Sequence, residues 1–123
     1  MTIIIAEDDD KVRETYIRAI RHFSKTEVEG VSNGRDLVEK VKEGDYDLIF
    51  TDNDMPLMSG LFAITQIRGF NSKVPICMIS GDRIEETRSE AMKIGATDYI
   101  DKGDYNNFTA NLKNVIGKYF PTN

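Results

Sequence analysis

We expect a single domain over residues 1–123, because the chain has the usual length of one domain and 40% of its residues are hydrophobic. The net charge of −5 argues against nucleic acid and against an anionic membrane surface as direct partners, since both attract clustered lysine and arginine. The lone cysteine, Cys77, excludes an internal disulfide, and no apolar run approaches the roughly 20 residues of a membrane span, so we expect a cytoplasmic protein.

The first half of the chain alternates between strand and helix patterns. Residues 2–6 form a short apolar run rich in isoleucine, which predicts a buried strand. Apolar residues then recur every three or four positions over residues 12–23, which predicts a helix that Asp9 or Asp10 can cap. The next expected elements are a weaker strand at residues 27–31 and a helix at residues 37–41 that ends at Gly44.

The second half repeats this alternation. Residues 47–51 predict a third strand, and a polar loop follows it from Asp52 to Gly60, with Asp54 and Pro56 inside the loop. The remaining expected elements, in chain order, are a helix at residues 61–67, a strand at 74–79, a helix at 84–94, a strand at 97–100 and a helix at 108–119.

Five strands that alternate with five helices predict an α/β fold in which helices cover both faces of a parallel sheet. Right-handed crossovers leave few topologies for such a sheet. We expect a doubly wound, flavodoxin-like sheet with strand order 2-1-3-4-5, and a six-stranded Rossmann sheet fits less well for want of a strand. Ligands of doubly wound sheets bind beyond the carboxyl ends of the strands, here between the first and third strands.

The predicted strand ends carry the polar residues best suited to chemistry. Glu7 and Asp8 follow the first strand, Asp52 follows the third, Ser80 the fourth and Lys102 the fifth. In the expected sheet these residues meet at one edge, where several carboxylates cannot all stay ionised without a positive counter-charge. Mg²⁺ is the simplest counter-ion, because it prefers oxygen ligands and often binds beside a phosphate. The residues therefore predict a metal-assisted phosphoryl site in which the central carboxylate, Asp52, can form an aspartyl-phosphate.

Four segments at these strand ends also carry a family resemblance. They are residues 3–8, residues 47–60, Ser80 with Gly81, and residues 95–102. In this order and spacing they resemble the receiver domain of response regulators in two-component signalling, similar to a chemotaxis regulator, over essentially the whole chain. The resemblance implies a phosphorelay protein that is not an enzyme but assists its own phosphorylation and dephosphorylation.

The resemblance also implies roles for the acidic residues. Asp52 corresponds to the phosphoacceptor, which takes a phosphoryl group from a histidine kinase, a histidine phosphotransfer protein or a small-molecule donor. Asp8 corresponds to a direct Mg²⁺ ligand, and Glu7 to an acid that holds the ion through water. Asp54 stands where the family donates a backbone carbonyl to the ion, and both Asp54 and Asp82 stand where the family tunes the rate of dephosphorylation.

The remaining implied roles concern the phosphoryl group and the output. Ser80 and Lys102 correspond to the hydroxyl and the ammonium that bind the phosphoryl group. Tyr99 corresponds to an aromatic switch residue that turns inward when the Ser80 hydroxyl moves, and the change is read on the face of the fourth helix, fifth strand and fifth helix. We expect a downstream protein target and a monomer or a weak, phosphorylation-dependent dimer. Because the last helix ends shortly before Asn123, we expect a stand-alone receiver or one cut from a longer protein.

Two residues depart from the family pattern. Lys102 is followed by Gly103, where the family typically has proline and often a cis bond. A cis bond before a residue other than proline costs roughly 2.5–4 kcal/mol, so we expect a trans bond here and a reshaped loop after the fifth strand. Gly81 replaces the more usual alanine, which we expect to leave access to Asp52 open.

Other functions fit parts of the pattern. A receiver-like interaction module that is never phosphorylated has the same fold, although Asp8, Asp52 and Lys102 argue against it. The residues from Asp52 to Asp54 are similar to a motif of haloacid-dehalogenase-like phosphohydrolases, but those enzymes place the nucleophile after their first strand. A flavin carrier is less compatible, because acids after the first strand would repel the flavin phosphate. For Asp9 and Asp10 we expect only solvated positions at a helix N-terminus.

Overall fold

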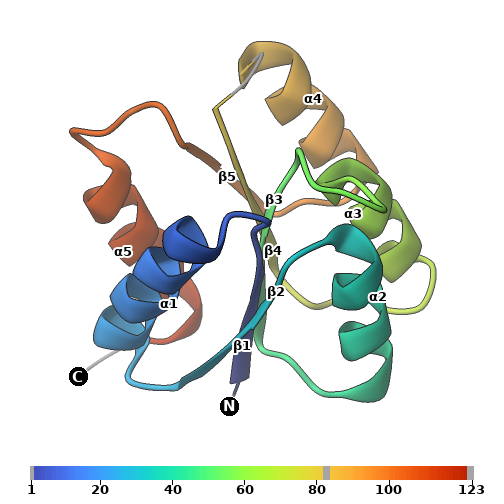
Figure 1. The fold of residues 1–123 in the computed structure, drawn as a ribbon, viewed down its shortest axis with the longest axis horizontal. Helices are drawn as coiled ribbons and strands as arrows, with labels where there is room; N and C mark the ends of the chain where they lie inside the picture. The colour runs from blue at the N-terminus through green and yellow to red at the C-terminus, as the bar shows by residue number, and fades with distance from the viewer. Residues whose placement is uncertain (1, 82–83, 122–123) are drawn as a thin grey trace.

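The computed structural model describes residues 2–81 and 84–121, and in them five strands alternate with five helices (Figure 1). The strands form one parallel sheet in the order β2-β1-β3-β4-β5, so the predicted topology is confirmed. In chain order the elements are β1 (Thr2–Ala6), α1 (Asp10–Ser24), β2 (Glu27–Val31), α2 (Gly34–Glu43), β3 (Leu48–Asp52), α3 (Gly60–Arg68), β4 (Ile76–Ser80), α4 (Ile84–Ile94), β5 (Asp98–Asp101) and α5 (Phe108–Tyr119).

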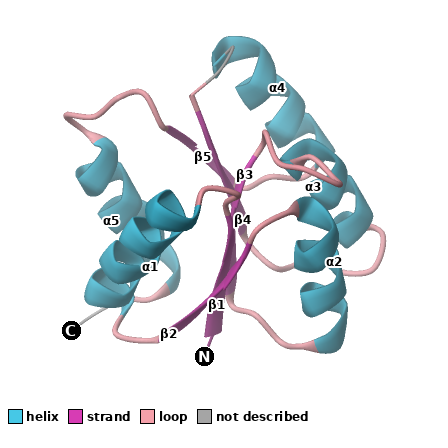
Figure 2. Cartoon of the chain, viewed as in Figure 1, coloured by secondary structure: helices cyan, strands magenta, loops and turns pink. Residues whose placement is uncertain are grey.

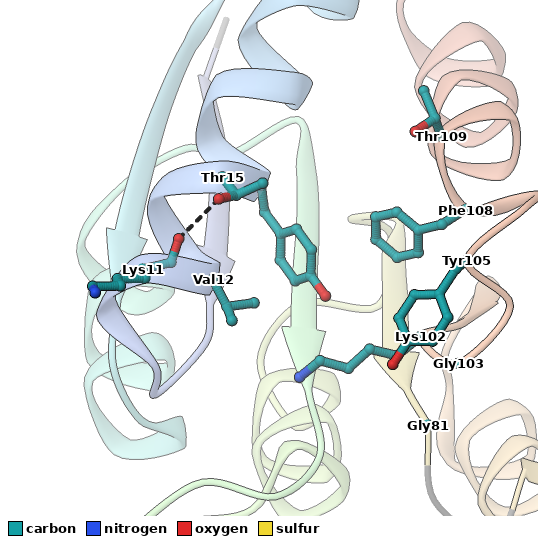
Figure 3. A pocket seen from close by; sticks show the side chains of 10 residues that line it. Lys11, Val12, Thr15, Gly81, Lys102, Gly103, Tyr105, Phe108 and Thr109 are labelled. Carbon is teal, nitrogen blue, oxygen red and sulfur yellow. Dashed lines mark hydrogen bonds between the residues drawn. The ribbon is translucent and has the colours of Figure 1, made fainter.

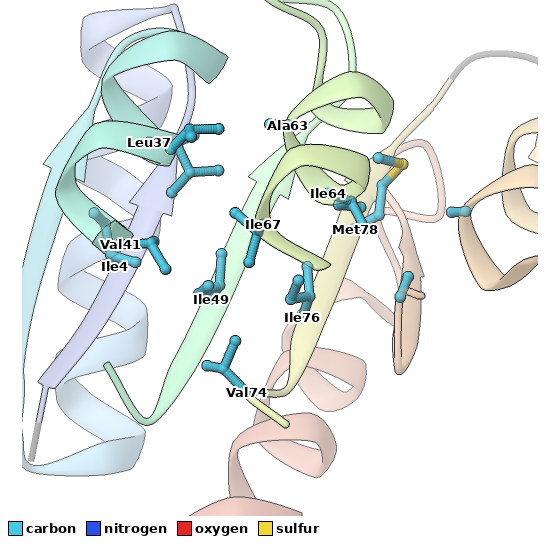
Figure 4. Close-up of a cluster of buried hydrophobic side chains, with 14 residues drawn as sticks. Ile4, Leu37, Val41, Ile49, Ala63, Ile64, Ile67, Val74, Ile76 and Met78 are labelled. Atoms are coloured by element: carbon cyan, nitrogen blue, oxygen red, sulfur yellow. The ribbon is translucent and has the colours of Figure 1, made fainter. Parts of the chain in front are cut away.

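Helices cover both faces of the sheet, with α1 and α5 on one face and α2, α3 and α4 on the other (Figure 2). Successive residues of a strand point to opposite faces, so each inner strand supplies side chains to both. Ile3, Ile5 and Phe50 belong to the core under α1 and α5. Ile4 and Ile49 belong to the core under α2 and α3 (Figure 4). Because both faces are buried, polar side chains gather at the strand ends.

Three strands start and end later in the chain than their apolar runs indicate, namely β3, β4 and β5. An apolar run shows where side chains are buried, whereas a strand continues as far as its backbone pairs with a neighbour. Asp52 pairs with Ile79, and Ser80 pairs with Asp101, so these polar residues extend the ladder. Asp52 and Ser80 are therefore the last residues of their strands.

Polar side chains cap three helices of the described residues. Asp9 accepts hydrogen bonds from two backbone N–H groups in the first turn of α1, so Asp9 rather than Asp10 is the cap. Asn33 and Ser59 cap α2 and α3 in the same way. Gly95 follows α4 with a φ of 122°, a conformation that glycine adopts readily. Within the described residues, no helix has both the length and the apolar character needed to cross a bilayer.

Candidate functional site

The carboxyl ends of β1, β3, β4 and β5 bring the predicted site residues together. Asp52 and Ser80 end β3 and β4, while Glu7 follows β1 and Lys102 follows β5. Parallel pairing of β1 with β3, of β3 with β4 and of β4 with β5 keeps these ends level. Residues as far apart in the chain as Glu7 and Lys102 thus share one edge of the sheet.

Three carboxylates form the acidic part of the site. Glu7, Asp8 and Asp52 each present a carboxylate oxygen, and these oxygens all lie within 4.8 Å of one another. Glu7 is 1% exposed and Asp52 is 8% exposed, whereas Asp8 is exposed to solvent. The side chain of Asp54 is exposed and does not belong to this group. Two buried acids beside a third, accessible acid form a concentrated negative charge.

Lys102 places one positive charge between the two buried acids. Its Nζ lies 2.8 Å from Glu7 Oε1 and 3.1 Å from Asp52 Oδ2, so the ammonium donates to both carboxylates. Hydrogen bonds between charged groups are shorter and stronger than neutral ones. This lysine therefore links the strand ends of β1, β3 and β5 through side chains.

Backbone groups orient the same carboxylates. The Asn53 N–H donates to Asp52 Oδ1 at 2.7 Å, and the Asp9 N–H donates to Glu7 Oε2 at 3.1 Å. Arg13 holds the backbone of Glu7, because its Nη1 donates to the Glu7 carbonyl oxygen at 2.8 Å. Sequence reasoning missed the contributions of Asn53 and Arg13. The spacing from Glu7 to Arg13 across a capped helix start is the signal that could have indicated the Arg13 contact.

Burial shapes the ionisation of the site. Burial raises the pKa of Glu7, and the nearby Asp52 charge adds to the rise even though Lys102 opposes it. Burial likewise raises the pKa of Asp52 above its usual range despite the opposing Lys102 charge. Burial alone would lower the pKa of Lys102, but its hydrogen bond to Glu7 and the Asp52 charge raise it above its ordinary value. One ammonium therefore compensates the buried acids only in part.

The donor set fits a hard divalent cation. Carboxylate oxygens are the ligands that Mg²⁺ prefers, and Mg²⁺ is commonly bound by one or two carboxylates together with water and phosphate oxygens. Glu7, Asp8 and Asp52 supply such oxygens, and Asp8 keeps the group accessible from solvent. The incomplete compensation by Lys102 also favours a further positive charge here. These three residues could hold the ion that the sequence predicts.

Ser80 and Tyr99 are brought together at the end of β4. Ser80 is 2% exposed, and its carbonyl oxygen accepts hydrogen bonds from the Lys102 N–H at 3.0 Å and from the Tyr99 hydroxyl at 3.3 Å. Tyr99 is half-buried on β5, and burial raises the pKa of its phenol. The Tyr99 side chain thus links β5 to the end of β4 by a hydrogen bond to Ser80. Asp82 lies outside the described residues.

A pocket of about 610 Å³ opens beside the site, between α1 and the segment that joins β5 to α5. Lys102, Tyr105 and Phe108 line it, with Thr15 among the residues of α1 on the other side (Figure 3). The Tyr16 ring stacks on Phe108 with ring centroids 5.2 Å apart. Long charged side chains commonly lay their stems on apolar surface while the charged end reaches polar partners. The pocket therefore meets the acidic site through Lys102.

Comparison with known proteins identifies relatives over most of the chain. The family model described as the response regulator receiver domain matches residues 3–113. The transcriptional regulatory protein ZraR of Escherichia coli K12 is 31% identical over 92% of this chain, which spans 26% of ZraR. The transcriptional regulatory protein PrrA of Mycobacterium tuberculosis is 28% identical over 81% of this chain and 42% of PrrA. The chain therefore corresponds to less than half the length of these relatives.

Solved structures share the fold. The receiver domain of the sensor histidine kinase PA1611 from Pseudomonas aeruginosa, which has a magnesium ion coordinated in its active site cleft, superposes with a TM-score of 0.81 at 24% identity, covering 98% of each chain. The phosphorylated cyanobacterial phytochrome response regulator RcpA superposes with a TM-score of 0.79 at 20% identity, covering 99% of this chain and 95% of RcpA. At these identities the likeness shows the fold.

Proposed function

The chain belongs to the response regulator receiver domain family, which acts in phosphorelay signalling, and on this premise we propose that Asp52 is its phosphoacceptor. One observation carries the proposal: Asp52 ends β3 within reach of both the Lys102 ammonium and the carboxylates of Glu7 and Asp8. An isolated aspartate at a strand end would have no such partners. We further propose that residues 1–123 act as one receiver unit, a phosphoacceptor rather than an enzyme that turns over a separate substrate.

In the proposed step, a carboxylate oxygen of Asp52 attacks the phosphorus of the donor. A phosphorus–oxygen bond forms to Asp52, and the bond from phosphorus to the donor nitrogen or oxygen breaks, with its electron pair leaving on the donor. The Asn53 N–H at 2.7 Å from Asp52 Oδ1 orients the carboxylate for this attack. The phosphoryl group adds about −1.5 to −2 of charge, and in this proposal Lys102 and the Ser80 hydroxyl would bind its oxygens.

We propose Mg²⁺ as the cofactor of this step. Glu7, Asp8 and Asp52 would hold it, together with the backbone carbonyl of Asp54. When bound, the ion supplies positive charge that offsets the negative charge of the phosphoryl oxygens. The ability of this chain to bind the ion rests on its own acids, of which Asp8 is the accessible one.

The proposed output runs through Ser80 and Tyr99. Engagement of the Ser80 hydroxyl by the phosphoryl group would favour a second arrangement of the β4 end, and the Tyr99 hydroxyl already contacts the Ser80 carbonyl oxygen. The face formed by α4, β5 and α5 would then present the change to a downstream protein. A histidine kinase or a histidine phosphotransfer protein would be the donor, and the chain would act as a monomer or as a weak dimer formed on phosphorylation.

Intact-protein mass spectrometry after incubation with acetyl phosphate and Mg²⁺ tests the assignment. We expect one phosphoryl group on the unchanged chain and on Asp45→Asn, a matched control that alters an exposed acid between α2 and β3, and none on Asp52→Asn. An adduct on neither Asp45→Asn nor the unchanged chain would indicate an interaction module that is not phosphorylated. An equal adduct on Asp52→Asn would place the acceptor elsewhere, and sustained hydrolysis of a phosphate ester by the isolated chain would indicate a phosphohydrolase.

A further inference from the structure

Lys102 has to reach two carboxylates from a position just past the end of β5. Its N–H donates to the Ser80 carbonyl oxygen at 3.0 Å, which is the last backbone bond between this segment and β4. Gly81 lies close on the same side, because a β-carbon added there would meet Lys102 Cβ at 3.3 Å. After Lys102 the chain leaves the sheet in a turn. The direction in which the lysine side chain points therefore depends on what holds this turn.

Asp101 closes the turn around Lys102 with two hydrogen bonds. Its side-chain Oδ1 accepts from the Gly103 N–H at 2.8 Å, and its carbonyl oxygen accepts from the Asp104 N–H at 3.2 Å. A carboxylate that accepts from the backbone two residues later stabilises a tight turn. Gly103 can donate this bond, whereas proline has no N–H to donate. No cis peptide bond occurs among the residues that the structure describes, so the expected trans bond between Lys102 and Gly103 is confirmed.

We propose that Asp101 is a positioning residue for Lys102, a role that rests on the proposed function of Asp52. The Ser80 carbonyl oxygen fixes the backbone before the lysine side chain, and the Asp101 carboxylate fixes the backbone after it. Held from both sides, the Lys102 ammonium lies between Glu7 and Asp52. Without the Asp101 side-chain bond, the turn after Lys102 keeps only the hydrogen bond from the Asp104 N–H to the Asp101 carbonyl oxygen, and we expect the ammonium to spend less time in reach of the phosphoacceptor.

Kinetic measurements with three variants test this role. Asp101→Ala removes the acceptor, Asp101→Asn keeps an oxygen that can accept the same bond, and Asp104→Ala removes a neighbouring carboxylate of the same loop. We expect Asp101→Ala to slow phosphorylation by acetyl phosphate about tenfold, and the other two variants to stay within about twofold of the unchanged chain. In a Lys102→Gln background, Asp101→Ala should cause no further loss, because Asp101 acts through Lys102. The same loss in both backgrounds, or equal rates for all three variants, would overturn the proposal.

A second readout does not require phosphoryl transfer. An ammonium held by two carboxylates exchanges its protons slowly enough to give a nitrogen–proton NMR signal, which Lys102→Gln would assign by its disappearance. We expect the signal in the unchanged chain and in Asp101→Asn, and its loss in Asp101→Ala. If the unchanged chain takes up no phosphoryl group, the function proposed for Asp52 fails, while this signal still tests the positioning. A signal that persists in Asp101→Ala, or is missing from the unchanged chain, overturns the role of Asp101.

Discussion

Gly60 begins α3 directly behind the strand end that carries Asp52, and it leaves no room for a side chain. A β-carbon added at Gly60 would lie 2.1 Å from the Asp52 carbonyl oxygen and 3.0 Å from Asn53 Cα. Non-bonded heavy atoms attract only near about 3.5–4.0 Å, so alanine must push α3 away from the end of β3. The shift would also break the hydrogen bond that the Gly60 N–H donates to the Asn53 carbonyl oxygen at 2.9 Å.

Two destabilising contributions and one stabilising contribution determine the expected loss of stability. Overpacking a filled interior costs about 1–3 kcal/mol, and leaving a buried backbone group unpaired costs about 1–3 kcal/mol. The better helix propensity of alanine returns about 1 kcal/mol at most, so Gly60→Ala should lower the free energy of unfolding by about 1–5 kcal/mol. Gly117 in α5 is a matched control, because an added β-carbon there meets nothing within 4 Å. Gly117→Ala should raise the free energy of unfolding by about 0.5–1 kcal/mol.

Urea denaturation followed by circular dichroism measures both variants, since the chain has no tryptophan to report unfolding by fluorescence. The displaced carbonyl belongs to Asp52 itself, so Gly60→Ala should also be phosphorylated more slowly than Gly117→Ala. A free energy of unfolding for Gly60→Ala within about 0.5 kcal/mol of the unchanged chain would refute the backbone clash.

Three further predictions concern a helix end, a half-buried phenol and the cation. The Arg68 guanidinium donates to the carbonyl oxygens of Gly95 and Asn71, so Arg68→Ala should lower the free energy of unfolding, measured in urea, by about 1.5–3 kcal/mol. Arg68→Lys should recover less than half of this loss. An Arg68→Ala variant as stable as the unchanged chain would contradict the prediction. Burial raises the pKa of Tyr16 to about 12, so its neutral phenol stabilises the fold fully below about pH 10, and this contribution is lost as the pH rises through 12. Tyr16→Phe should therefore lose less stability over this pH range than the unchanged chain, and an equal loss would argue against the role of the phenol. Mg²⁺ at about 100 times its dissociation constant should raise the free energy of unfolding by about 2.7 kcal/mol, and an equal gain in Asp8→Ala would place the ion elsewhere.

Sequence patterns predicted the strand order and the edge where the site lies, because each of these follows from alternation and from parallel pairing. The same patterns placed the ends of β3, β4 and β5 too early, since apolar runs stop where burial stops. Asp52, Ser80 and Asp101 are polar yet remain in the backbone ladder. A polar residue at a strand end is therefore the place where apolar patterning is least informative about the boundary.

The contacts that orient the site were less accessible from the sequence. Sequence reasoning brought Glu7 and Lys102 to the same edge, but their direct pairing depends on side-chain lengths and on how the turn after β5 closes. In the bonds from Asn53 to Asp52 and from Gly103 to Asp101, a backbone N–H donates to an aspartate side chain, so the residue type of the donor carries little signal. The sequence showed that Gly103 departs from the family pattern. The hydrogen bond from its N–H to Asp101 could be recognised only from the geometry of the turn.

The ionisation of the acids connects the fold to the proposed chemistry. Burial raises the pKa of Glu7 and of Asp52, so each contributes stability when protonated at low pH and loses it as the pH rises through its folded pKa. Ionisation of the two acids therefore weakens the fold, and the Lys102 ammonium opposes that effect. Stability alone would not favour two buried acids at this position, so cation binding explains them better. A bound cation neutralises the acids and thereby recovers the lost stability. The negative charge that first argued against nucleic acid is thus concentrated where a cation, and then a phosphoryl group, would bind.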